Sequence, residues 1–347
     1  MHSLIKKDVD AFKGLLILLV VVGHNSFITR GMPDFNKLLY TFHVFLFFYL
    51  PFLFDVTGIS CRALIDRLVR YGVPYTFFCV LAAALYFFSY GKSGDSLWLA
   101  DFVVGFGVGS APLLGRVTGF QLYWFLPAIF TLFVFRSFAE GLDRKWKRVL
   151  LVVFCVLHGF IGLFPQVLKV YAPLGVLIVI FVYPVGILCR LFWVRLSQAA
   201  LLRLGVISFI GLLFSLLVAD RLRIWINLAE LRVYAVDNIL MLLLQDLISL
   251  FAFFAFLGLS SIYSRFDFLV FLGRNSLLIY LVHSLYFQFV IRALSGLRLD
   301  SISIGVVSLV VTVLLSMLSA HVLNSSKRLK GLLFPKNFVE WRKECCG

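Results

Sequence analysis

Charged residues are scarce in this sequence, and acidic ones are scarcest. Only 14% of the 347 residues are Asp, Glu, Lys or Arg, and 17 acidic residues stand against 32 basic ones. Hydrophobic residues make up 62% of the chain and the mean hydropathy is +1.01, which is more apolar surface than a soluble core could bury. The composition excludes a soluble globular enzyme and predicts a polytopic membrane protein.

Cysteines are also few, and their spacing fits neither a disulfide framework nor a zinc site. Four of the six lie in or beside apolar runs, where small sulfur-containing side chains serve as packing residues. We therefore expect no metal site. These four are Cys61, Cys79, Cys155 and Cys189.

Ten apolar runs of membrane-spanning length follow one another, and the first lacks the small-residue cleavage site of a signal peptide. We expect an all-α polytopic bundle of about ten transmembrane helices, with residues 1–325 forming one membrane domain and 326–347 a short basic cytoplasmic tail. The predicted spans are 11–29, 38–60, 71–90, 120–138, 149–165, 172–193, 204–219, 238–262, 276–293 and 302–323.

The net charge of +15 is distributed in short blocks between the apolar runs, which disfavours a nucleic-acid-binding face. With the N-terminus inside, 22 of the 32 lysines and arginines fall on the cytoplasmic side. This bias follows the positive-inside rule and predicts both termini in the cytoplasm. The outer segment 91–119 contains GFGVGSAPLLG, which we interpret as a flexible or re-entrant loop because neither a strand nor a Lys-Ser pair accompanies it.

Several ionisable residues fall within or at the ends of these spans, where such side chains face the bundle interior and frequently mark function. Packing through interhelical hydrogen bonds is the alternative for each. His24 differs because Asp10 and Lys13 share its helix face, and it lies about 16 Å deeper than Lys13, near the middle of a ~30 Å hydrocarbon core. The group comprises His24, His43, Asp55, His158, Asp246 and His283.

Five blocks in order resemble the acyltransferase-3 family of integral membrane acyltransferases, in particular its fucose-acetylase-like, polysaccharide O-acetyltransferase branch. The chain departs from the family where Leu50 and Pro51 replace the usual Ser-Gly at the end of the second block. The blocks are DVDAFKGLLILLVVVGHNS, LLYTFHVFLFFYLPFLFDV, RALIDRLVRYGVPY, FQLYWFLPAIF and LGRNSLLIYLVHSLYF.

The resemblance implies transfer of an acyl group, usually acetyl, from cytoplasmic acetyl-CoA to a sugar hydroxyl of a surface polysaccharide or an undecaprenyl-linked saccharide, in the bacterial inner membrane. We expect His24 to remove the hydroxyl proton or to carry the acyl group. Asp10 would set the charge balance near the inner face. It cannot contact His24 directly, because about 21 Å of helix separates the two residues. His43 would approach His24 from the second span.

Arg67 and Arg70 lie three residues apart on one helical face, where guanidinium groups can hold the phosphates of CoA; positive-inside anchoring is the alternative. We also predict Lys13, Asn275 and Ser276 as donor-binding residues, the last two with a capping role on the ninth helix. Tyr123 and Trp124 are expected as membrane-interface anchors. A non-enzymatic transporter, flippase or polymerase partner for lipid-linked saccharides remains the alternative function.

Overall fold

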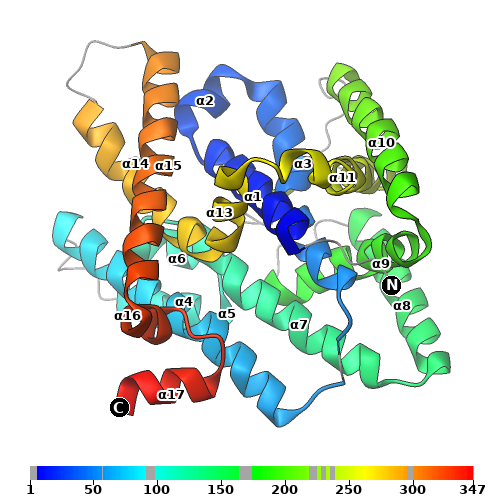
Figure 1. The fold of residues 1–347 in the computed structure, drawn as a ribbon, viewed down its shortest axis with the longest axis horizontal. Coiled ribbons are helices and arrows are strands. Elements are labelled where there is room, and N and C mark those ends of the chain that lie inside the picture. Colours follow the sequence, from blue (N-terminus) through cyan, green and yellow to red (C-terminus); the bar gives the residue numbers. More distant parts are fainter. Residues whose placement is uncertain are drawn as a thin grey trace. The chain divides into compact units, whose positions relative to one another are not determined.

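The computed structural model of the chain describes residues 6–56, 58–90, 98–163, 174–218, 225–227, 232–234, 239–294 and 300–346. Most of these residues are helical (Figure 1). The strands among them are two three-residue segments, β1 (Trp225–Asn227) and β2 (Arg232–Tyr234), which pair with each other. The predicted all-α fold is confirmed.

The helices group into two compact units, and α9 and α15 each run from one unit into the other. Unit 1 comprises Met1–Phe54, Val185–Ile226 and Val233–Ala320, and unit 2 comprises Asp55–Pro184, Asn227–Arg232 and His321–Gly347. Unit 1 contains α1 (Lys6–Gly23), α2 (Ser26–Gly31), α3 (Pro33–Tyr49), η1 (Leu50–Leu53), α10 (Gln198–Val218), α11 (Ile239–Gly258), α12 (Ser260–Tyr263), α13 (Asp267–Arg274), α14 (Ser276–Leu294) and most of α15 (Ser301–Ser325). Unit 2 contains α4 (Cys61–Tyr90), α5 (Trp98–Val108), α6 (Ala111–Thr118), η2 (Leu122–Trp124), α7 (Phe125–Gly141), α8 (Arg144–Leu163), α16 (Lys327–Leu333) and α17 (Phe338–Cys346); α9 (Leu174–Arg195) is shared.

Each of the ten predicted spans overlaps one of the long helices, so the polytopic bundle is confirmed. Among the described residues, seven helical segments are long and apolar enough to cross a membrane. The predicted spans outside this set are α1, which carries charges in its first half, α8, which begins with RKWKR, and α11, whose apolar part is shorter. The seven are Pro33–Leu53, Cys61–Ser89, Leu122–Gly141, Gly175–Arg195, Gln198–Ser215, Ser276–Leu294 and Ser301–Ser325.

Helix α1 lies at the centre of unit 1, in contact with α3, α13 and α14 (Figure 1). Its contact with α13 is backbone to backbone, because a Cβ on Gly14 would lie 1.9 Å from the Leu269 carbonyl oxygen and one on Gly273 would lie 1.6 Å from that of Asp10. No helix was predicted at Asp267–Arg274, between the eighth and ninth spans. This eight-residue helix packs against the N-terminal half of α1.

The first predicted span, 11–29, is too long, because α1 ends at Gly23 and a second helix begins at Ser26. Asn25 makes this break: its Oδ1 accepts hydrogen bonds from the backbone N–H groups of Phe27 and Ile28, both at 3.2 Å. Its Nδ2 donates to the Gly305 carbonyl at 2.7 Å and to Ser308 Oγ at 3.1 Å, both in α15. His24 therefore lies in a turn that is fixed to another helix.

The interpretation of 91–119 as a flexible or re-entrant loop is wrong for its described part, which forms α5 and α6. These helices pack against each other, and Gly109 joins them with a φ of +66°, a conformation that suits glycine. Arg116 and Asp101 pair across them at 2.8 Å. The remaining residues of this segment, 91–97, lie outside the described residues.

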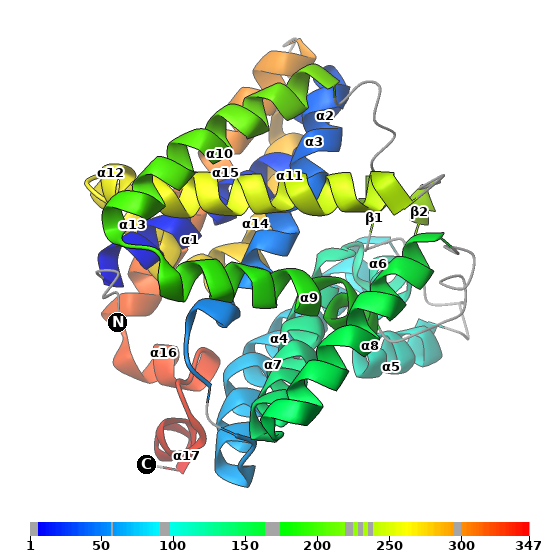
Figure 2. The ribbon, with the colours of Figure 1, turned by 90° about the vertical axis from the view of Figure 1, so that its right-hand side faces the viewer.

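Unit 2 is built on α4, α7 and α8, which run alongside one another in Figure 2. Tyr123 and Trp124 are buried inside it, with 0% and 6% of their surface exposed, so their predicted role as interface anchors is wrong. The basic tail is helical: α16 and α17 contact α4, and the Phe338 N–H donates to Asp66 Oδ1 at 3.0 Å. Residues 326–346 therefore dock on unit 2.

Candidate active site

A pair of histidines occupies the end of α1 in unit 1. His24 Nδ1 lies 2.8 Å from His283 Nε2, and the rings stack with centroids 5.0 Å apart and planes at 19°. His283 comes from the middle of α14 and is fully buried, whereas His24 is half-buried. Among the described residues, no further partner bonds the other ring nitrogen of His24, Nε2.

The hydrogen bonds of His283 place its proton. Its Nδ1 lies 3.0 Å from the Ile279 carbonyl oxygen one turn earlier, and a carbonyl can only accept. Nδ1 of His283 is therefore protonated. Ser284 Oγ lies 3.2 Å from Nε2, the same atom that faces His24.

A third imidazole borders the same turn. His43 in α3 is fully buried, and its Nδ1 donates to the Leu39 carbonyl at 2.7 Å. Its Nε2 has no hydrogen-bond partner among the described residues, and a Cβ on Gly23 would lie 3.6 Å from this atom. Tyr40 packs against the His43 ring, with centroids 4.7 Å apart, and donates from its hydroxyl to the Gly23 carbonyl at 3.1 Å. His43 therefore lies beside Gly23 at the end of α1, and its approach to His24 itself stays a prediction.

The three histidines do not form a metal site by geometry. No three His, Cys, Asp or Glu side chains within the described parts of the chain are placed to bind one metal ion.

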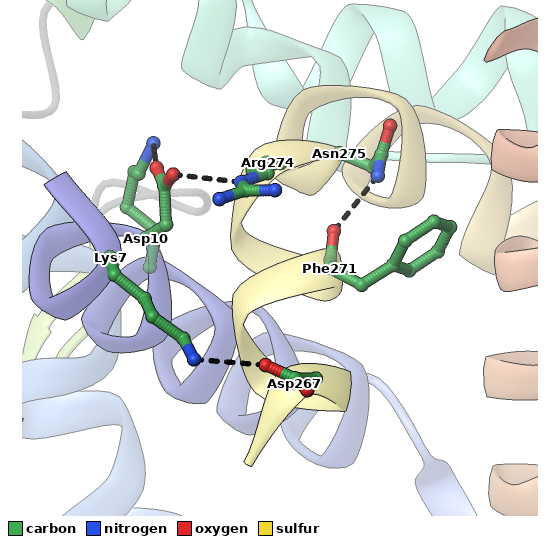
Figure 3. Close-up of polar contacts among 7 residues, drawn as sticks. Lys7, Asp10, Asp267, Phe271, Arg274 and Asn275 are labelled. Carbon is green, nitrogen blue, oxygen red and sulfur yellow. Dashed lines mark hydrogen bonds and ion pairs between the residues drawn. The ribbon is translucent and has the colours of Figure 1, made fainter. Parts of the chain in front are cut away.

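Asp10 lies in a cluster of charges near the N-terminal end of α1 rather than beside His24. Its buried carboxylate pairs with Lys13 Nζ at 2.7 Å and with Arg274 Nε at 3.2 Å. Figure 3 shows Asp10 facing Arg274 of α13, with a second bridge between Lys7 and Asp267 at 3.0 Å. Arg274 bonds Asp10 through Nε and has 61% of its side chain exposed.

The two residues after Arg274 have different local roles. Asn275 Nδ2 donates to the Phe271 carbonyl at 2.8 Å, so this bond closes the C-terminus of α13 (Figure 3). The Asn275 side chain therefore caps α13, and its capping of the ninth helix stays a prediction. Ser276 is the first residue of α14.

Arg67 and Arg70 belong to α4 in unit 2 and share one face of it. The Arg67 guanidinium lies 4.7 Å from the centroid of the Phe133 ring, a cation–π contact, and Arg70 is exposed. His158 also belongs to unit 2, where it is buried with its ring centroid 5.3 Å from that of Phe181.

Sequence reasoning left His283 undecided between packing and function, and counted Arg274 only as an inside-positive charge. The available signal for His283 was its place in the late Gly-x-x-Ser-Leu-x-x-Tyr-x-x-His block. No sequence signal indicated that Arg274 pairs with Asp10, because the two residues are 264 positions apart in the chain.

Comparison with known proteins gives two matches. A family model described as an acyltransferase domain matches residues 6–321. Nodulation protein NolL of Sinorhizobium fredii (strain NBRC 101917 / NGR234) is 32% identical over 177 residues, which are 46% of this chain and 43% of that protein. The match thus covers less than half of this relative. No solved structure matches the chain.

Proposed function

The chain belongs to the acyltransferase-3 family, whose model covers nearly all of it, and on this premise we propose that it is a membrane O-acyltransferase that transfers an acetyl group. The donor is acetyl-CoA, and the acceptor is a sugar hydroxyl of a surface polysaccharide or an undecaprenyl-linked saccharide. The membrane is the bacterial cytoplasmic membrane. The relative with 32% identity is named for nodulation, and we carry none of that role to this chain.

One observation carries the proposal: His24 is half-buried, and one of its ring nitrogens is bound to His283 while the other has no partner among the described residues. Imidazole at neutral pH is the side chain best suited to accept a proton from a hydroxyl. His24 Nε2 is therefore the general base. An ionisable side chain within a membrane-spanning segment costs free energy, which favours a functional use of His24.

The chemistry balances with this single base. The acceptor O–H bond breaks and its proton goes to His24 Nε2, while the oxygen attacks the thioester carbonyl and forms the ester C–O bond. The C–S bond of the donor then breaks, and His24 returns the proton to the thiolate sulfur as free CoA. The histidine is regenerated in its starting form.

The donor needs cationic groups for its phosphates, and each unit supplies two. In unit 1 Lys13 and Arg274 share one carboxylate, Asp10, so this cluster carries a net positive charge. In unit 2 Arg67 and Arg70 lie on one face of α4. Guanidinium groups bind phosphate oxygens in pairs. We propose two separate candidate sets of donor-binding residues: Lys13 and Arg274 with the adjoining Asn275 and Ser276 in unit 1, and Arg67 and Arg70 in unit 2.

The test compares the same substitution at two histidines, one in each unit. His24→Gln and His158→Gln are expressed at equal membrane levels, and acetyl transfer from radiolabelled acetyl-CoA to the endogenous glycan is measured in isolated membranes. We expect His24→Gln to lower the rate by roughly 10²-fold or more, the range of a positioned general base. His158→Gln should retain the wild-type rate, because His158 packs against Phe181 in unit 2.

A transporter, flippase or polymerase partner for lipid-linked saccharides would use the same buried histidines as proton relays and would need no acyl donor. Mass spectrometry of surface glycans from cells with and without the gene separates the two. A loss of one acetyl group per repeat supports the transferase. An unchanged acetyl content with less glycan at the surface supports transport and overturns the proposal.

A further inference from the structure

We infer that His283 is a positioning residue that fixes His24 in the tautomer with its lone pair on Nε2. The inference rests on the proposed function of His24 as the base, and it adds which atom acts and what holds it. The observation behind it is a chain of two hydrogen bonds that starts at the Ile279 carbonyl and ends on the His24 ring.

The Ile279 carbonyl determines which atoms donate and which accept along these two hydrogen bonds. The Ile279 carbonyl accepts, so Nδ1 of His283 carries the hydrogen. His283 is fully buried among apolar groups, where the neutral form of an imidazole without a carboxylate partner is favoured. Neutral His283 with its proton on Nδ1 has a lone pair on Nε2, so Nε2 accepts from Nδ1–H of His24 across 2.8 Å.

The other tautomer of His24 is disfavoured by the same geometry. With its proton on Nε2, His24 would direct the lone pair of Nδ1 at the lone pair of His283 Nε2, only 2.8 Å away. Two facing acceptors lose the hydrogen bond and repel each other. Ser284 Oγ lies 3.2 Å from the same nitrogen of His283; since that nitrogen carries no hydrogen, the hydroxyl can only donate to it and shares its single lone pair with His24.

The partner of the base is thus a neutral ring instead of a carboxylate. The titratable groups that face the pair from the neighbouring elements are His43 and Tyr40 of α3 and Tyr280 of α14. Among the described residues, no Asp or Glu is hydrogen-bonded to either ring. When His24 takes the acceptor proton on Nε2, its Nδ1–H makes a charge-assisted bond to His283, which stabilises the ion pair of the transition state without a buried anion.

Two substitutions at one position separate the hydrogen bond from packing. His283→Gln keeps an acceptor near the position of Nε2 but loses the ring, and His283→Phe keeps a ring but loses the acceptor. Acetyl transfer is measured for both at equal amounts of folded protein. We expect His283→Phe to lower kcat by roughly 10²-fold or more with little change in KM, and His283→Gln to retain at least ten times the kcat of His283→Phe.

The reverse order, with the Phe variant as active as the Gln variant or more so, would show that His283 only fills space and would overturn the inference. Phe287→Leu is the control, because it removes a ring that packs against His283, with centroids 6.3 Å apart, without touching the hydrogen bonds of His283. This variant should keep the wild-type kcat. An inactive wild-type protein would instead count against the proposed function.

A spectroscopic measurement on the wild-type protein tests the tautomer without any turnover. NMR of protein labelled with ¹³C and ¹⁵N at histidine distinguishes the two neutral tautomers, and the spectrum of His24→Gln identifies the His24 signals. We expect the proton of His24 on Nδ1. A proton on Nε2 would overturn the inference, whether or not either His283 variant folds.

Discussion

At the scale of single residues, Asn25 decides where the turn that contains His24 lies. Its side-chain amide is fully buried and both accepts and donates hydrogen bonds. Oδ1 caps α2, and Nδ2 donates to the Gly305 carbonyl and to Ser308 Oγ of α15. A helix that continued past Gly23 would carry His24 on a different face. The position of the proposed base therefore depends on a neighbouring side chain that performs no chemistry.

We predict that Asn25→Asp is more harmful than Asn25→Ala. The carboxylate keeps the cap but directs an acceptor at the oxygens of Gly305 and Ser308, whereas alanine loses the cap at about 1 kcal/mol and leaves buried groups unpaired at roughly 1–3 kcal/mol. Thermal unfolding in detergent, followed by size-exclusion chromatography, measures the order. Greater stability of the Asp variant would contradict this account.

At the scale of helices, the crossing of α1 and α13 depends on two glycines. We predict that Gly273→Ala separates this helix pair, because a Cβ there would lie 1.6 Å from the Asp10 carbonyl oxygen. The expected loss of stability exceeds about 3 kcal/mol, the upper range of overpacking, and activity should fall with it because α1 carries His24.

The matched control for this crossing is Gly107→Ala in α5, where an added Cβ meets nothing within 4 Å. It should be neutral, or stabilising by roughly 0.5–1 kcal/mol, because alanine favours a helix over glycine. Unfolding transitions of both variants are compared under the same conditions. Similar transitions for both would show that α1 and α13 do not cross at this glycine.

The same helices show what sequence could and could not provide. Apolar length located every long helix, because a span must be continuous and about 20 residues long. It missed α5, α6 and α13, which are at most 11 residues and therefore indistinguishable from loops by that criterion. The crossing at Gly14 and Gly273 was also invisible, since close approach depends on a partner distant in the chain.

The candidate site was predictable to the same extent. His24 was identified because its depth and its helix face can be counted along one chain segment. Its partner was not, because the choice of His283 among the intramembrane histidines depends on a contact across 259 residues. Asp10 was expected to be remote from His24, and its ion pairs with Lys13 and Arg274 now give it a separate role near the N-terminal end of α1.

At the scale of the whole molecule, the excess of positive charge can orient the protein in the membrane or bind the donor. The number of lysines and arginines alone does not distinguish these two roles. Orientation by the positive-inside rule requires only that the lysines and arginines face the cytoplasm. Donor binding requires that particular ones hold phosphate. Arg62, Arg67 and Arg70 all lie on α4. Only Arg67 and Arg70 fit the Arg-x-x-Arg-x-x-x-Pro pattern within the third family block, so the three offer a comparison within one helix.

We predict that the double variant Arg67→Ala, Arg70→Ala raises the KM for acetyl-CoA at least about tenfold, the loss expected when charged hydrogen bonds of roughly 1.5–3 kcal/mol are removed. With acetyl-pantetheine, a donor that lacks the nucleotide phosphates, the variant and the wild-type protein should have the same KM. Arg62→Ala, which removes an exposed charge from the same helix, should leave both values unchanged. An equal loss with both donors would mean that these arginines hold the helix in place instead of the phosphates, and would leave Lys13 and Arg274 as the donor-binding cations.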